Sequence, residues 1–168
     1  MKKLISFFLL VLFLMGCQKN EVVSEFTGNE TNYALSQASN YSISGVVTLK
    51  ERKDGTTTVA VELEGTQGEA IFPVHLHLGD VSTPKADIAA ILNPVAAAQG
   101  KSETVITKLA DESSVNYQQL ISLKACIKIH LSDTGAEKDI VIAGGNIGKS
   151  ATSASSTGRV GFAECKSE

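Results

Sequence analysis

The sequence lacks the motifs that mark several common enzyme classes. It contains no glycine-rich phosphate loop, no GxSxG nucleophile elbow and no HExxH zinc motif, which argues against the enzymes that use them. It has no basic run and a net charge of −3, which argues against a nucleic-acid partner. Histidine is also scarce, with three in 168 residues. Ser/His/Asp and Cys/His nucleophilic arrangements stay open, although every histidine lies where a metal ligand is expected.

The only long apolar run lies at the N-terminus and is too short to span a bilayer as a helix. Lys2 and Lys3 precede the apolar residues 4–15, which is the pattern of a signal peptide. The following "LMGC" resembles the lipobox of bacterial lipoproteins, with Met15 as a less usual residue within it. That resemblance implies cleavage after residue 16 and lipidation of Cys17, with stable membrane attachment in the bacterial cell envelope. Ordinary secretion with cleavage nearby is the alternative.

The rest of the chain is predicted to be a tether followed by one domain. Residues 17–40 are polar and rich in Asn, Ser, Thr and Glu, so we expect them to form a flexible tether. Residues 41–168 leave about 130 residues, a usual length for a single core. Apart from Cys17, the cysteines are Cys126 and Cys165. In an oxidising compartment they are predicted to form a disulfide, with two buried thiols as the alternative.

Short alternating runs with Gly- and Asp-marked turns predict an all-β domain. Two β-branched runs flank "KDG" at residues 53–55 and predict a hairpin over residues 41–65. Further strands are predicted at 70–80, 102–109, 125–133, 139–148 and 158–165, the last two separated by a flexible Ser/Thr/Ala-rich segment. No long helix is evident. The predicted fold is an antiparallel β-sandwich or Greek-key barrel.

Two segments leave the secondary structure open. Residues 82–101 are rich in alanine, but Pro94 and Gly100 interrupt the pattern, so a loop with a short strand or helix is expected. Residues 114–123 form either a short helix or a loop, because Tyr117 and Leu120 are three positions apart.

Two of the three histidines stand one residue apart in "FPVHLHLGD", residues 72–80. In a strand His75 and His77 share one face, with apolar residues on the other, and their Cα atoms are about 6 to 7 Å apart. Such a pair is able to bind one ion with bonds of about 2 Å. His130 lies on another alternating strand and is the candidate third ligand. Imidazoles bind Cu, Zn, Ni or Fe, so ligand type does not select the metal. A surface or hydrogen-bonded pair of histidines is the alternative.

The order of these segments resembles two known families. "SGVVTLKERKDGTTTVAVELEG", "FPVHLHLGD", "IKIHLSD" and "GGNIGKS" resemble landmarks of the copper/zinc superoxide dismutase fold. "HLH" followed by "VNYQQLISLKACIKIHLSD" is similar to the CHRD domain, a β-sandwich module of exported bacterial proteins. Both imply a Greek-key β-sandwich over residues 41–165.

The dismutase resemblance implies a copper site, with His75, His77 and His130 at the positions of three copper ligands. The bridging histidine and the zinc ligands of that family have no counterpart, so the resemblance does not extend to a zinc subsite, and rapid dismutation is doubtful. Lys149 or Arg159 would stand in for the family's guiding arginine. Lys128, on the face of His130, is a further candidate for attracting an anion. The CHRD resemblance implies a fold but no catalytic role.

Two functions follow. The first is a lipid-anchored protein that binds a metal ion, with copper as the expected cofactor, for superoxide handling or metal capture. The second is a non-enzymatic module of the envelope, without metal, that binds a protein or a glycan through the segment at 82–101. Elemental analysis separates the two.

Overall fold

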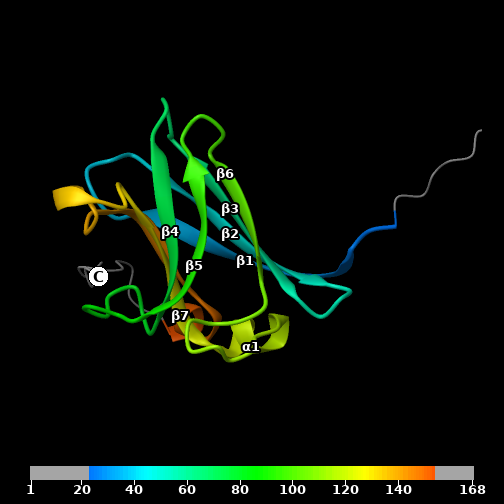
Figure 1. Ribbon diagram of the computed structural model, residues 1–168. Coiled ribbons are helices and arrows are strands. Elements are labelled where there is room, and N and C mark those ends of the chain that lie inside the picture. Colours follow the sequence, from blue (N-terminus) through cyan, green and yellow to red (C-terminus); the bar gives the residue numbers. More distant parts are fainter. Residues whose placement is uncertain (1–22, 154–168) are drawn as a thin grey trace, which may run out of the picture.

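Antiparallel strands close into one barrel (Figure 1). The computed structural model describes residues 23–153 of the chain. Its elements are β1 (Phe26–Gln37), β2 (Ser44–Arg52), β3 (Thr57–Glu64), β4 (Ile71–Leu78), β5 (Ile88–Ala96), β6 (Lys101–Ile106), α1 (Tyr117–Ser122), β7 (Lys124–His130), the 3₁₀ turn η1 (Gly135–Glu137), β8 (Val141–Ile147) and α2 (Gly148–Ser153). The prediction of an all-β, antiparallel fold is confirmed.

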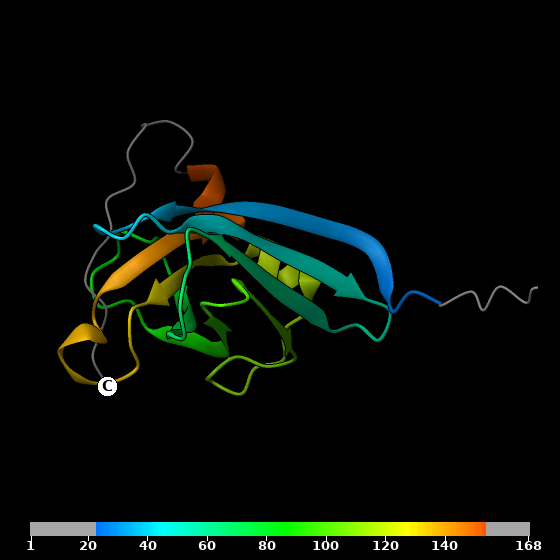
Figure 2. The same cartoon turned by 90° about the horizontal axis from the view of Figure 1, so that it is seen from above.

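The order of strands around the barrel is β1-β2-β3-β6-β5-β4-β7-β8. The connection from β3 to β4 therefore crosses over β6 and β5, which brings β4 beside β7. Two strand pairings are short. Strands β5 and β6 pair only at Ala96↔Lys101, and β1 pairs with β8 only at Ser36↔Gly144 and Gln37↔Ala143. Figure 2 shows β1, β2 and β3 lying side by side in one part of the barrel.

The apolar core fills the barrel, and α1 contributes to one end of it. Tyr117 and Leu120 of α1 are buried in the core cluster, and the Tyr117 hydroxyl lies 2.6 Å from the Thr31 hydroxyl of β1. Asn116 caps the helix through a capping box with Gln119. The open prediction for residues 114–123 is thus resolved as a short helix.

The predicted hairpin at residues 41–65 is confirmed as β2 and β3. Its turn begins at Asp54, whose carboxylate accepts a hydrogen bond from the Thr56 backbone N–H at 3.0 Å. Gly55 follows with a φ of +85°, a left-handed conformation that side chains disfavour. Val47 and Leu49 face inward opposite Val61 and Val59, as the alternation predicted.

The predicted tether at residues 17–40 is wrong for residues 26–37, which form β1. This strand pairs with β2 from Phe26↔Arg52 to Leu35↔Gly45. Its outer face is exposed, which accounts for its polar composition, whereas Leu35 is 2 % exposed and lies in the core. Backbone pairing therefore orders a segment with few apolar side chains. Within the described residues the domain begins before residue 41.

The segment at 82–101, predicted to be a loop with a short strand or helix, contains strand β5 over Ile88–Ala96. Within β5, Pro94 falls between Leu92 and Val95, which pair with β4. The Ser/Thr/Ala-rich segment expected to be flexible begins within helix α2. The strand predicted at 158–165 lies outside the described residues.

Candidate metal centre

The three histidines lie on the outer face of the sheet formed by β4 and β7. In β4, Phe72, Val74 and Leu76 point into the core, so His75 and His77 point outward. In β7, Ile127 and Ile129 point into the core and His130 points outward. These faces are the ones that alternation predicted.

The pairing of β4 with β7 brings the histidines together. His75 lies opposite Lys128 and His77 lies opposite Cys126, which places His130 just beyond the His75 pair. The ring centroids are 4.7 Å apart for His75 and His130, 5.7 Å for His75 and His77, and 6.1 Å for His77 and His130. One ring nitrogen from each residue lies within 4.8 Å of the other two. The predicted convergence of three imidazoles is confirmed.

Two of the rings are buried although they lie outside the barrel. His77 is 1 % exposed and His130 is 2 % exposed, whereas His75 is only partly buried. The segments that follow the two strands, residues 79–87 and 131–140, supply a backbone contact to each buried ring. His75 is therefore the most exposed of the three rings.

Backbone carbonyls orient the two buried rings. The Nδ1 atom of His77 lies 2.9 Å from the carbonyl oxygen of Ala86, and that of His130 lies 2.9 Å from the carbonyl oxygen of Lys138. Because a carbonyl only accepts, each Nδ1 carries a proton and donates it, and Nε2 keeps its lone pair. The Nε2 atom of His77 is buried without a hydrogen-bond partner. Metal-binding histidines show this arrangement, with one nitrogen held by the protein and the other available.

The surroundings keep both buried rings neutral at pH 7. Burial is the main cause that lowers the pKa of His77 to about 4; the hydrogen bond to Ala86 opposes it, and the charges of Lys128 and His75 act in the same direction as burial. Burial, followed by the charge of His75, lowers the pKa of His130 to about 4 as well. A neutral imidazole is the form that binds a metal ion, so no proton competes for these ligands near neutrality.

The other predicted site residues do not join the cluster. Lys128 lies on the predicted face, opposite His75, but it is fully buried and is not a solvated surface lysine. Lys149 belongs to α2, and its backbone N–H bonds to Leu123 at the end of β7 away from His130. Cys126 is buried opposite His77. Cys17, Arg159 and Cys165 lie outside the described residues, so lipidation, the disulfide and the role of Arg159 stay predictions.

Sequence reasoning missed a polar contact beside the histidines. Asn146 of β8 accepts a hydrogen bond from the Val81 backbone N–H at 2.7 Å and donates one to the Asp80 carboxylate. Burial raises the pKa of Asp80, but hydrogen bonds from Ser82 and Asn146 and the charge of Lys128 outweigh it and lower that pKa overall. The sequence feature that pointed to a polar contact here was Asp80, which lies three residues after His77.

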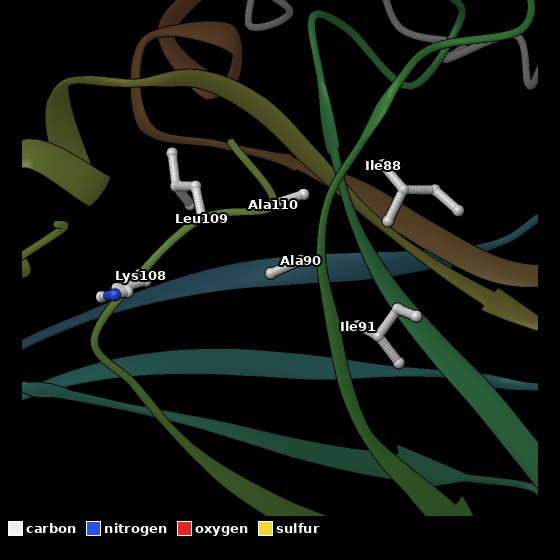
Figure 3. A pocket seen from close by; sticks show the side chains of 6 residues that line it. All are labelled: Ile88, Ala90, Ile91, Lys108, Leu109 and Ala110. Carbon is white, nitrogen blue, oxygen red and sulfur yellow. The ribbon is translucent and has the colours of Figure 1, made fainter. Parts of the chain in front are cut away.

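An apolar groove of about 330 Å³ lies along β5, and two of its lining residues, Ile91 and Ile88, pair with His75 and His77 (Figure 3). In Figure 3 Ala90 and Ala110 point toward one another, and Ile88 and Ile91 project from the other side of β5. Lys108, the one charged residue of the lining, forms an ion pair with Glu112 at 3.0 Å. The groove offers apolar contact and no group suited to acid–base or metal chemistry.

No known protein-family model, no curated protein and no solved structure matches this chain. Between residues 23 and 153, no helix is both long enough and apolar enough to cross a membrane. The function is therefore inferred from the geometry of the imidazole cluster.

Proposed function

We propose that this protein binds one metal ion through the imidazoles of His75, His77 and His130. The observation that carries the proposal is the Nε2 atom of His77, which is buried without a hydrogen-bond partner and belongs to the three-histidine cluster. A buried polar atom left without a partner costs about 1 to 3 kcal/mol. A bound ion would remove that cost by taking the lone pair.

The spacing of the ring nitrogens fits an ion after small movements. Three nitrogens that each lie about 2 Å from one ion are about 3 Å from one another. The observed separations are within 4.8 Å, so each ring needs to move by about 1 Å. With His75, His77 and His130 as its three protein ligands, a tetrahedral ion would keep one position for a small ligand.

Copper is the metal we propose, on the resemblance to the dismutase and CHRD families. The strand order β3-β6-β5-β4 supports a Greek-key sandwich of that type. Strands β4, β5 and β6 follow one another as antiparallel neighbours, and β6 then lies beside β3. The cluster contains imidazoles alone, a ligand set that copper and zinc both accept. The metal's identity therefore depends on a loading experiment.

Metal capture is the activity that this mostly buried set of three ligands supports best. Two of the three rings are almost fully buried, which slows exchange with solvent and favours retention of the ion. Reaction with superoxide is the second candidate, favoured by the one partly exposed ligand, His75. We place the protein in the bacterial cell envelope, anchored through lipidated Cys17, on the lipobox resemblance.

Elemental analysis of the purified full-length chain tests the proposal. The chain is loaded with Cu²⁺ or Zn²⁺ and freed of excess ion. We expect about one ion per chain, and its loss in the double variant His75→Ala, His77→Ala. Ile91→Ala is the matched control, since Ile91 lies opposite His75 on the neighbouring strand and offers no ligand atom.

A chain that stays metal-free after loading with both ions would refute the proposal. The alternative, a binding module of the envelope without metal, would then remain. Retention of the full stoichiometry in the double variant would equally contradict the assignment of the ligands.

A further inference from the structure

The chain turns sharply immediately after the second histidine. Gly79 has a φ of +92°, and a Cβ added there would lie 2.9 Å from the Thr83 hydroxyl oxygen. The Thr83 backbone N–H donates to the carbonyl oxygen of Asp80 at 2.7 Å. The Asp80 carboxylate accepts from the Ser82 N–H at 2.9 Å and from its hydroxyl at 2.7 Å. These contacts make residues 79–83 a compact, hydrogen-bonded turn.

Asn146 joins this turn to the barrel wall. Its side chain is 8 % exposed and uses both ends of the amide: the oxygen accepts from Val81 N–H at 2.7 Å, and the nitrogen donates to the Asp80 carboxylate. An amide side chain supplies a donor and an acceptor from one planar group without titrating. Asn146 and His77 occupy the same row across the sheet, because Asn146 pairs with Cys126 and Cys126 pairs with His77.

The other end of the same segment holds the ring of His77. The carbonyl oxygen of Ala86 lies 2.9 Å from His77 Nδ1. The carbonyl oxygen of Asp87 accepts from the Leu78 N–H at 2.9 Å, which closes the segment against the end of β4. The position of the Ala86 carbonyl therefore depends on both attachments of residues 79–87, one at Asn146 and the other at β4.

We propose that Asn146 is a positioning residue for the metal site, which fixes segment 79–87 so that the Ala86 carbonyl holds His77 with Nε2 directed at the cluster. This inference rests on the proposed function, because the direction of the His77 Nε2 atom matters for metal binding when His77 is a metal ligand. Outer contacts of this kind change metal affinity by about 10- to 100-fold when removed.

The first test needs no metal. The ring nitrogens of the full-length, metal-free chain are observed by ¹⁵N NMR at neutral pH, where three histidines give few signals. We expect His77 in the wild type to be protonated at Nδ1 alone, and Asn146→Ser to show both tautomers. Asn93→Ser is the matched control, because the Asn93 amide also donates a hydrogen bond, in this case to the backbone carbonyl of Glu103. A single unchanged tautomer in Asn146→Ser would overturn the proposal.

Exchanging the side chains of Asp80 and Asn146 provides a second test, in which the double variant is expected to recover the metal affinity that a single variant loses. Asn146→Asp places two carboxylates face to face, whereas the double variant Asp80→Asn, Asn146→Asp restores one donor and one acceptor with the original net charge. We expect Asn146→Asp to lower Cu²⁺ affinity by about 10- to 100-fold and the double variant to recover most of it. This pair decides the matter if the serine variant does not fold, and a failure to recover would contradict the proposal.

The two tests separate this inference from the proposed function. If the wild type binds no metal but its His77 tautomer depends on Asn146, the metal proposal fails and the positioning role holds. If the wild type binds copper and neither Asn146 variant changes the tautomer or the affinity, the positioning role alone is refuted.

Discussion

The rings of His75 and His130 lie 4.7 Å apart, centroid to centroid, although the two residues belong to different strands. Their proximity follows from the crossover that places β4 beside β7, with Val74 opposite Ile129 on the core face. The same register aligns the outer faces, so the histidines meet outside the barrel. A shift of one residue in this pairing would turn one set of rings into the core.

Replacing His77 by leucine is expected to abolish metal binding without weakening the metal-free protein. Leucine has a similar volume and removes the buried Nε2 that has no partner, which offsets the loss of the hydrogen bond to Ala86. We expect the free energy of unfolding of the metal-free chain to change by less than about 1 kcal/mol. Urea unfolding in the presence of a chelator measures it.

Leu76→Ala is the control for that variant. Leu76 is 1 % exposed and faces the core from the position before His77. We expect it to lower the free energy of unfolding by about 2 to 5 kcal/mol while the folded fraction still binds metal. If His77→Leu destabilised the chain as much as Leu76→Ala, the unpartnered nitrogen would have no energetic cost.

Acidification is expected to weaken the metal-free fold before the carboxylates titrate. Burial lowers the pKa of His77 and His130 from 6.5 to about 4. Between those values the unfolded chain takes up protons that the folded chain refuses, so the free energy of unfolding falls as pH falls. The slope is about 1.4 kcal/mol per pH unit for each histidine. It vanishes above about pH 7, where both states are neutral.

Urea unfolding at pH 5, 6 and 7, with a chelator present, measures this slope. His77→Gln removes one of the two titrating groups and is expected to halve it. An unfolding free energy that does not change between pH 5 and 7 would show that both rings titrate normally in the folded chain.

Strand β1 is expected to be essential to the fold. A chain lacking residues 1–37 loses β1, one of the two strands that pair with β2, and the core residue Leu35, whereas one lacking residues 1–22 retains both. We expect the shorter deletion to give a cooperative thermal transition by circular dichroism and the longer one to give none. A cooperative transition in the longer deletion would restore the interpretation of residues 26–37 as a tether.

Gly145→Ala is expected to disturb the closure of the barrel. A Cβ at Gly145 would overlap the carbonyl oxygen of Ala34 in β1, where β1 and β8 pair over only two positions. We expect a loss of about 3 kcal/mol in the free energy of unfolding. Gly28→Ala is the comparison, because a Cβ there meets nothing within 4 Å and costs only the backbone strain of a φ of +97°, about 1 to 2 kcal/mol. Equal losses in the two variants would contradict the predicted overlap.

Alternation along the chain was sufficient to predict the strands that carry the site and the side of each strand on which its histidine lies. His75, His77 and His130 all follow from a period of two, because side chains in a strand point alternately to opposite faces. The same reasoning failed for β1, whose exposed face made it polar, and it left β5 open between strand, helix and loop, because Pro94 suggested an interruption. Composition alone does not reveal which backbone a strand pairs with.

The sequence by itself determined an all-β chain with three imidazoles on outward faces. Only the tertiary structure decided that β4 lies beside β7, that residues 79–87 and 131–140 bury two of the rings, and that Asn146 contacts the turn after His77. These relationships join segments far apart in the chain, and they depend on the crossover between β3 and β4 and on the register of pairing. Local patterns specify the faces of a strand but not its neighbours, and the site exists only between neighbours.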